Sequence, residues 1–376
     1  FITFGEHDLS EQIIHLVLAR VPDAPPGTKG ISCFIVPKLL VEEDGSLGGP
    51  NNVSCVSIEE KMGINASPTC VMSYEGSVGY LIGEPNQGMR YMFTMMNNAR
   101  LAVGLQGLAL GERAYQAAAA YAHERRQGRA PGAAAGEQSA IVELPDVRRM
   151  LLTMRSTVEA MRAICYVNAH ALDLAAAHPD DAVRQENQEL ADWLTPISKG
   201  WCTDMGVEVT SEAIQVFGGM GYIEETGVAQ YYRDARIAPI YEGTNGIQAM
   251  DLVGRKLPLR GGAVAGDFLA RVEATADKLA GGDLDELSRQ LTSAHGVVKQ
   301  ATDWLMANGL EDPVNALAGA TPYLRMCGLL AGGWLLARSA EVAQASLAAG
   351  EGDRRQLEQK VVSARFFCLQ VLPQVE

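Results

Sequence analysis

The 376-residue sequence lacks the cysteine and histidine patterns that define several classes of protein. Its seven cysteines are odd in number and scattered, and no Cys-x-x-Cys pair occurs, so neither a disulfide framework nor a zinc site is indicated. Reduced thiols in the cytoplasm are the simplest account of them. The six histidines are dispersed without a His-x-x-x-His pair, which argues against a metal centre.

Signals for membranes and nucleic acids are also missing. The longest apolar run, Leu329 to Ala337, contains two glycines and is far shorter than a membrane span. The formal net charge is −14, and basic residues do not cluster with aromatic ones, so nucleic-acid binding is not expected. The chain opens on Phe1 rather than Met, within a strand-like stretch, and we expect it to be truncated at its N-terminus.

Hydrophobic periodicity predicts a mainly α protein with a β portion. Short runs rich in β-branched residues, separated by Pro, Gly and Asn, predict an antiparallel β-domain over residues 1–78. Helical spacing then predicts a four-helix-bundle domain over 84–256, interrupted by a Gly/Ala-rich loop at 127–140. A further C-terminal helical domain is expected over 265–376. No catalytic grouping occurs in it, which favours a role in packing or assembly.

Glu242 is the acid most worth testing as a catalytic group. It lies in Pro239-Ile-Tyr-Glu-Gly-Thr-Asn-Gly-Ile-Gln248, between apolar residues and a Thr244 that can cap a helix. The N–H groups from Asn245 onward would point back at an anion. Removal from water would disfavour the charged carboxylate and strengthen it as a base. The local sequence leaves open the alternative of an ordinary surface acid near a helix start.

A second candidate is Gln215-Val-Phe-Gly-Gly-Met-Gly-Tyr222, with three glycines in four positions. Glycine lets a backbone approach a flat or phosphorylated ligand closely. A helix C-terminus would explain one of the three. No strand precedes the segment, so the dinucleotide-binding Rossmann motif is not indicated.

These two segments, with Tyr232-Arg-Asp-Ala-Arg-Ile237 between them, resemble the C-terminal signature of the acyl-CoA dehydrogenases. Members of this family use FAD to introduce a trans double bond between Cα and Cβ of an acyl-CoA. The resemblance covers residues 1–256, although the family's N-terminal helical domain is missing from the sequence. The tail at 265–376 is similar to that of a longer branch, which includes 3-methylthiopropanoyl-CoA dehydrogenases.

The resemblance implies roles for individual residues. Glu242 would be the base that removes the α-proton, and FAD N5 would accept the hydride from Cβ. The implied FAD contacts are Phe1, Ile2, Thr3, Arg125, Gln215, Gly218, Gly219, Thr244 and Asn245. The implied substrate contacts are Asn97, Arg100, Tyr241 and Gly243. As alternatives, Phe1 and Thr3 are plain strand residues, Arg125 is a solvated arginine, and Arg100 is a surface helix arginine.

The resemblance also implies partners. Arg125 and the glycines would reach FAD across the interface of a homodimer or a dimer of dimers. An electron-transfer flavoprotein would take up the electrons, and the process would belong to fatty-acid and lipid metabolism. Two other readings stay open from the sequence: an acyl-CoA oxidase that uses oxygen, and a non-catalytic assembly fragment without flavin.

Overall fold

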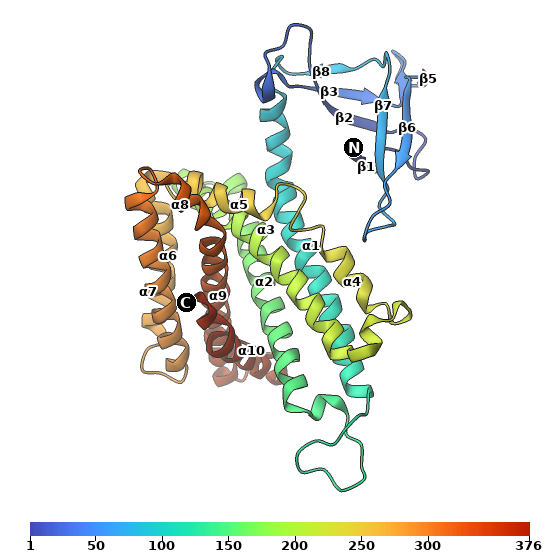
Figure 1. Cartoon of the computed structure of the whole chain (residues 1–376). Coiled ribbons are helices and arrows are strands. Elements are labelled where there is room, and N and C mark those ends of the chain that lie inside the picture. Colours follow the sequence, from blue (N-terminus) through green and yellow to red (C-terminus); the bar gives the residue numbers. More distant parts are fainter. The chain divides into compact units, whose positions relative to one another are not determined.

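The computed structural model describes residues 1–376, with the side chain of Asn97 outside the described part. The chain divides into two compact units, Phe1–Ala99 and Arg100–Glu376. All the strands belong to the first unit (blue in Figure 1), and the second is helical.

The first unit is built from short antiparallel strands. These are β1 (Ile2–Thr3), β2 (Ile14–Ala19), β3 (Ser32–Pro37), β4 (Leu39–Val41), β5 (Leu47–Pro50), β6 (Val53–Ile58), β7 (Thr69–Tyr74) and β8 (Tyr80–Ile82). They form sheets of order β1-β7-β6 and β2-β3-β8, and β4 pairs with β5. The predicted antiparallel β portion is confirmed. The strands β4, β5 and β8 are too short to show an alternating pattern in the sequence.

A buried histidine links the two three-stranded sheets. His15 on β2 is 3% exposed, and its Nε2 lies 2.6 Å from Gly5 O. Because a carbonyl only accepts, Nε2 carries the proton, and Nδ1 accepts from Tyr74 Oη on β7 at 2.9 Å. Burial raises the pKa of Tyr74 to about 12, so this phenol remains a donor across the neutral pH range.

The second unit begins with the helices of the predicted bundle region and one short additional helix. They are α1 (Gly88–Glu124), which starts in the first unit, α2 (Pro145–Ala177), α3 (Asp181–Phe217), α4 (Val228–Ala235) and α5 (Asn245–Asp251). Pro145 stands in the first turn of α2, where its missing N–H costs nothing. Asp180 caps α3 by accepting from Ala182 N at 2.8 Å. The short α4 was missed by the sequence reading.

The C-terminal helices share a hydrophobic core with α2 and α3. They are α6 (Ala263–Leu279), α7 (Asp285–Asn308), α8 (Pro313–Ala318), α9 (Ala320–Ala349) and α10 (Arg354–Phe366). The expected C-terminal helical part is thus confirmed, and α9 lies among the other helices in Figure 1. The domain boundaries predicted at 78, 84, 256 and 265 stay predictions.

Glycines allow α1 and α3 to pack with their backbones in contact. A Cβ added to Gly206 on α3 would lie 2.7 Å from Gly107 O, and one on Gly107 would lie 2.6 Å from Cys202 O. A similar approach joins α9 to α3, where a Cβ on Gly328 would meet the Trp201 ring at 2.2 Å. These contacts fix the position of α3, which carries much of the candidate site.

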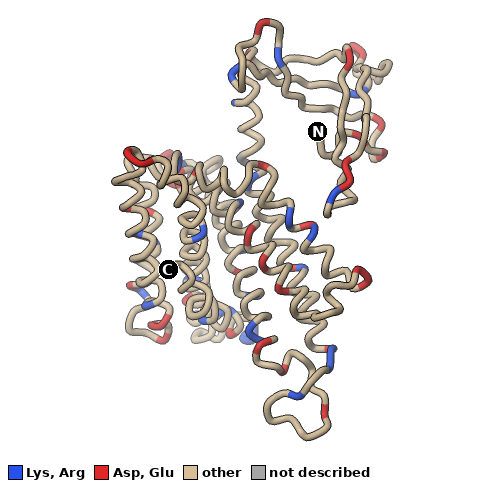
Figure 2. The backbone as a smooth tube through the Cα atoms, in the orientation of Figure 1, with Lys and Arg blue, Asp and Glu red and all other residues tan. Residues whose placement is uncertain are grey.

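Charged residues are distributed over both units. Figure 2 shows acidic and basic positions interleaved along the same helices. Among the described residues, no helix is both long and apolar enough to cross a membrane.

We predict that Gly206→Ala lowers the free energy of unfolding by about 1–3 kcal/mol, because the new methyl group meets backbone atoms that have no freedom to move aside. Gly296→Ala, in the middle of α7, is the matched control, since nothing lies within 4 Å of its added Cβ. This control should gain roughly 0.5–1 kcal/mol from helix propensity. Urea unfolding of both variants tests the pair, and equal midpoints would contradict the close packing.

Candidate active site

Glu242 occupies a strained turn between α4 and α5. Its φ is 57° and that of the next residue, Gly243, is 81°. Left-handed backbone is uncommon for residues other than glycine, and such strain is often found at functional sites. The turn is closed by Asn245 N, which donates to Pro239 O at 2.9 Å. Thr244 caps α5 as predicted, accepting from Ile247 N at 3.3 Å.

The Glu242 carboxylate is half-buried and incompletely paired. Its Oε2 is enclosed and has no hydrogen-bond partner among the described residues. Beside it, Tyr241 Oη donates to Gln106 Oε1 on α1. Burial raises the pKa of the Tyr241 phenol, the bond to Gln106 lowers it, and the Glu242 charge raises it. Of the apolar residues expected to shield Glu242, Ala238 is buried but Ile240 is 48% exposed.

The Asn245 side chain is turned inward, onto α3. Its Nδ2 donates to Gly200 O at 3.0 Å, to Thr203 Oγ1 at 3.0 Å and to Asp204 Oδ1 at 2.7 Å. Its Oδ1 accepts from Lys199 Nζ at 2.9 Å. Both the side chain and the N–H of Asn245 therefore have protein partners. Its contact with FAD stays a prediction, but the structure gives it a clear second role as the link between α5 and α3.

Arg100 is buried, which excludes the reading of a surface arginine. It is 6% exposed, and its Nη1 lies 3.4 Å from Asp251 Oδ2 at the end of α5. Asp251 also accepts from Arg255 Nε at 2.9 Å. Arg100 Nε is enclosed and unpartnered within the described part of the chain, as is Gln248 Oε1. The predicted substrate contact of Arg100 stays open, and that of Asn97 lies outside the described residues.

A second cluster brings together three of the predicted cofactor residues. Arg125, Gly218 and Gly219 line a hollow of about 410 Å³ between the end of α1 and the end of α3. Tyr121 and Phe217 also line it and stack on each other, with ring centroids 4.1 Å apart and planes at 13°. Gln215 is exposed one turn earlier on α3 and is not among the lining residues.

The three glycines of this segment have different structural reasons. Gly218 ends α3 with a φ of 60°. A Cβ on Gly221 would lie 2.4 Å from Ile214 O, so this glycine serves packing. Gly219 has neither constraint. No described atom lies within 4 Å of an added Cβ, and its backbone is not in the left-handed region. The space beside Gly219 is open to a ligand. Arg233 supports the following turn through its ion pair with Glu224 at 2.7 Å.

Phe1, Ile2 and Thr3 belong to the other compact unit. Ile2 pairs with Cys70 and Thr3 with Thr69 in the β1–β7 ladder, and Phe1 is 85% exposed. Their predicted flavin contacts therefore stay predictions.

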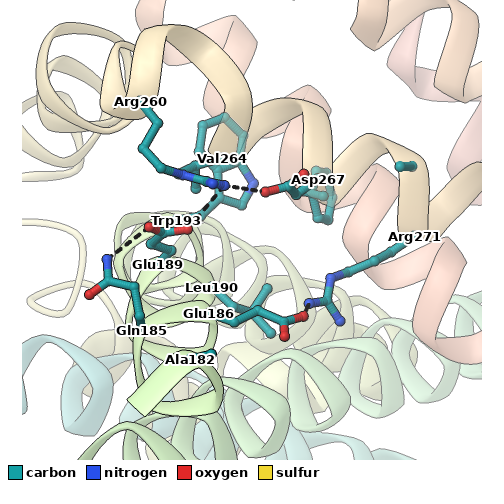
Figure 3. Close-up of a pocket in the computed structure, with 12 residues that line it drawn as sticks. Ala182, Gln185, Glu186, Glu189, Leu190, Trp193, Arg260, Val264, Asp267 and Arg271 are labelled. Carbon is teal, nitrogen blue, oxygen red and sulfur yellow. Dashed lines mark hydrogen bonds and ion pairs between the residues drawn. The ribbon is translucent and has the colours of Figure 1, made fainter.

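Another hollow contains none of the predicted site residues. It measures about 550 Å³ and lies between α3 and α6 (Figure 3). Arg260 contacts both Glu189, at 3.1 Å, and Asp267, and Arg271 pairs with Glu186 at 2.5 Å. Since these charges are already matched to one another, we place the candidate active site at Glu242.

Comparison with known proteins identifies the family. A family model described as "Acyl-CoA dehydrogenase, C-terminal domain" matches residues 86–257, and one described as "Acetyl-CoA dehydrogenase C-terminal like" matches residues 268–376. The chain is 50% identical over 374 residues to the 3-methylmercaptopropionyl-CoA dehydrogenase of Ruegeria pomeroyi, covering 99% of this chain and 63% of that protein. A butyryl-CoA dehydrogenase of Syntrophomonas wolfei is 34% identical, with 100% of this chain and 63% of the relative covered.

Solved structures share the fold. Caenorhabditis elegans ACDH-11 in complex with C11-CoA gives a TM-score of 0.74 at 21% identity, over 96% of this chain and 57% of that one. A Bacillus anthracis acyl-CoA dehydrogenase complexed with FAD gives 0.71 at 21% identity, over 96% and 59%. The chain belongs to the acyl-CoA dehydrogenase family, and the predicted resemblance is confirmed. It spans a little under two thirds of the length of the curated relatives named above.

We predict that Lys199 makes stability depend on pH. Burial lowers the pKa of its ammonium to about 8 from 10.5, against the opposing effect of Asp204. The unfolded chain therefore binds this proton more tightly between those two pH values, and the free energy of unfolding rises with pH across that window. Below pH 8, burial of the charged ammonium lowers the free energy of unfolding by on the order of 3 kcal/mol. Lys199→Met should remove this rise.

The comparison of wild type with Lys199→Met is the informative one, since other groups titrate in the opposite sense. Burial raises the pKa of Cys327 and of Cys368 to about 12, so their contribution to stability falls at high pH. Urea unfolding of both proteins at pH 7 and pH 10 measures the difference. If the free energy of unfolding changed equally between pH 7 and pH 10 in the wild type and the variant, the prediction would be contradicted.

Proposed function

We propose that the protein of which this chain is part is an FAD-dependent acyl-CoA dehydrogenase, with Glu242 as the base that removes the α-proton. The observation that carries the proposal is the half-buried Glu242 carboxylate, held in a left-handed turn with an enclosed and unpartnered oxygen. An oxygen in that state is available to a proton on a bound substrate. The family membership supplies the reaction class.

The chemistry asks for a base and for a group that binds the thioester oxygen. An α-proton of a thioester is weakly acidic, so its removal becomes feasible only if the oxygen is hydrogen-bonded as it gains charge. The backbone N–H of Glu242 makes no hydrogen bond within the described part of the chain. It is therefore free to donate to that oxygen. Base and donor then belong to one residue, whose turn is fixed by Asn245.

FAD, when bound, supplies the hydride acceptor that faces Cβ. The hollow at Arg125, Gly218 and Gly219 fits the adenosine diphosphate portion of this cofactor. Arg125 offers a guanidinium that suits phosphate, Gly219 leaves space beside the backbone, and the Tyr121–Phe217 stack offers an aromatic wall. We propose that this hollow serves the FAD of a partner subunit in a homodimer.

The substrate class follows from the relatives. 3-Methylmercaptopropionyl-CoA and butyryl-CoA are the first substrates to test, because the two relatives described above are named as dehydrogenases of these thioesters. An electron-transfer flavoprotein is the proposed acceptor, in the cytoplasm, within fatty-acid and lipid metabolism. A flavin that reoxidises rapidly in air after reduction by substrate would instead favour an oxidase, and a protein that binds no flavin would favour an assembly role.

We predict that Glu242→Gln retains FAD but slows anaerobic flavin bleaching by acyl-CoA roughly 100- to 10,000-fold, because the amide cannot take up the proton. Stopped-flow absorbance of the FAD-loaded protein measures the rate. Glu225→Gln, at an exposed acid in the preceding turn, is the control and should bleach like wild type. Bleaching at the wild-type rate in Glu242→Gln would remove the assignment.

We predict that Gly219→Leu weakens FAD binding by at least about tenfold without lowering the midpoint of unfolding of the flavin-free protein. The Cβ enters the open space of the hollow, where no described protein atom lies within 4 Å, and the side chain competes there with the cofactor. Flavin fluorescence titration gives the affinity. An unchanged affinity would show that the cofactor does not use this hollow.

A further inference from the structure

Lys199 is a buried lysine that has no role in the reaction proposed above. It lies in the middle of α3 and is 0% exposed, among the largest fully buried side chains of the protein. Lysine is almost never fully buried unless it is paired. Its Nζ donates to the neutral Asn245 Oδ1 at 2.9 Å, and no ion pair of Lys199 is present among the described residues. Packing alone does not account for an ammonium at this position.

The hydrogen bond of Lys199 acts on the turn that holds Glu242. Asn245 is the first residue of α5 and closes the turn through its N–H to Pro239 O. Its Oδ1 is shared between Lys199 Nζ and Thr203 Oγ1, the latter at 3.3 Å. Loss of the Lys199 donor would leave this oxygen with one long contact. The Lys199 bond is the shortest one that Asn245 Oδ1 makes, and together with the bonds of Nδ2 it holds Asn245, and with it the turn at 239–245, against α3.

The charges around Lys199 come from three elements. Asp204 lies one turn further along α3, Arg100 is on α1, and Glu242 is in the turn before α5. Burial lowers the pKa of Lys199 most strongly; Asp204 raises it, Arg100 lowers it and Glu242 raises it. The ammonium therefore lies within electrostatic range of the Glu242 carboxylate without contacting it. With a pKa of about 8, the Lys199 side chain is mostly positively charged at neutral pH.

Stability offers no reason to keep this arrangement. A buried charge carries a desolvation penalty that a well-packed apolar side chain of similar length avoids. Methionine would fill the same space in α3. An ammonium at this position is explained if it serves the chemistry of the neighbouring turn.

We propose that Lys199 is a positioning residue for Glu242, which fixes the left-handed Glu242–Gly243 turn through Asn245 and presents a positive charge to the carboxylate. The inference rests on the proposed function, because it assigns Lys199 to the support of the proposed base.

Two variants separate the hydrogen bond from the charge. Lys199→Met removes both, whereas Asn245→Ala removes the acceptor and keeps the ammonium. Lys256→Met is the matched control: Lys256 also joins α3 to the segment after α5, through Asp192 Oδ1 at 3.0 Å, but it lies outside the Glu242 network. The FAD-loaded proteins are compared in rate of flavin reduction at saturating acyl-CoA and in dissociation constant for acyl-CoA.

We expect Lys199→Met and Asn245→Ala to slow reduction by about 10- to 100-fold, as a displaced catalytic group does, while the acyl-CoA dissociation constant changes less than about threefold. Lys199→Met should be the slower of the two, since it also loses the charge. Lys256→Met should reduce its flavin at the wild-type rate. A Lys199→Met protein that is reduced as fast as Lys256→Met would overturn the inference.

Amide hydrogen exchange of the flavin-free chain gives an independent readout. We expect the amides of residues 242–245 to exchange roughly tenfold faster in Lys199→Met and Asn245→Ala than in wild type or Lys256→Met. Unchanged exchange there would overturn the positioning role. A wild-type protein that acyl-CoA does not bleach would instead sink the proposed function, while the exchange experiment would still decide whether Lys199 holds the turn.

Discussion

The hydrogen bonds of one side chain, Asn245, hold the candidate site in place. Through them the start of α5 is attached to a full turn of α3, from Lys199 to Asp204. α3 is itself fixed by backbone contact with α1 at Gly107 and Gly206. The backbone of Glu242 is strained, and such a conformation persists only where several surrounding contacts hold it in place. The close packing of α1 on α3 and the hydrogen bonds of the Asn245 amide to α3 provide these contacts.

Periodicity and turn chemistry were enough to predict the fold class and to select Glu242 as the candidate base. Long helices with repeated apolar spacing, such as α2 and α3, lie where the bundle was predicted, after the loop at 127–140. Strands of three residues carry too little pattern to be found. Glu242 was identifiable because it stands alone between apolar residues and a capping threonine, and the family signature gave it a role.

Interactions between distant residues could not be predicted. The burial of Arg100 depends on Asp251, which is 151 residues away, and nothing near Arg100 in the sequence indicates it. Lys199 reads locally as an ordinary helix lysine, and only the fold shows that it is enclosed. The position of Asn245 at a helix start suggested a contact with a phosphate, but nothing in the sequence indicated that its amide would also contact four polar atoms on α3. In each case tertiary packing decided the outcome.

The continuous core between the bundle and the C-terminal helices has an evolutionary consequence. Trp201 on α3 packs against both Gly328 of α9 and the ring of Phe367, so the two segments matched by separate family models meet at single side chains. A change in volume on either side must be accommodated on the other. The C-terminal helices at 268–376 therefore do not form an independent module. A substitution in their core constrains which substitutions the bundle at 86–257 can accept.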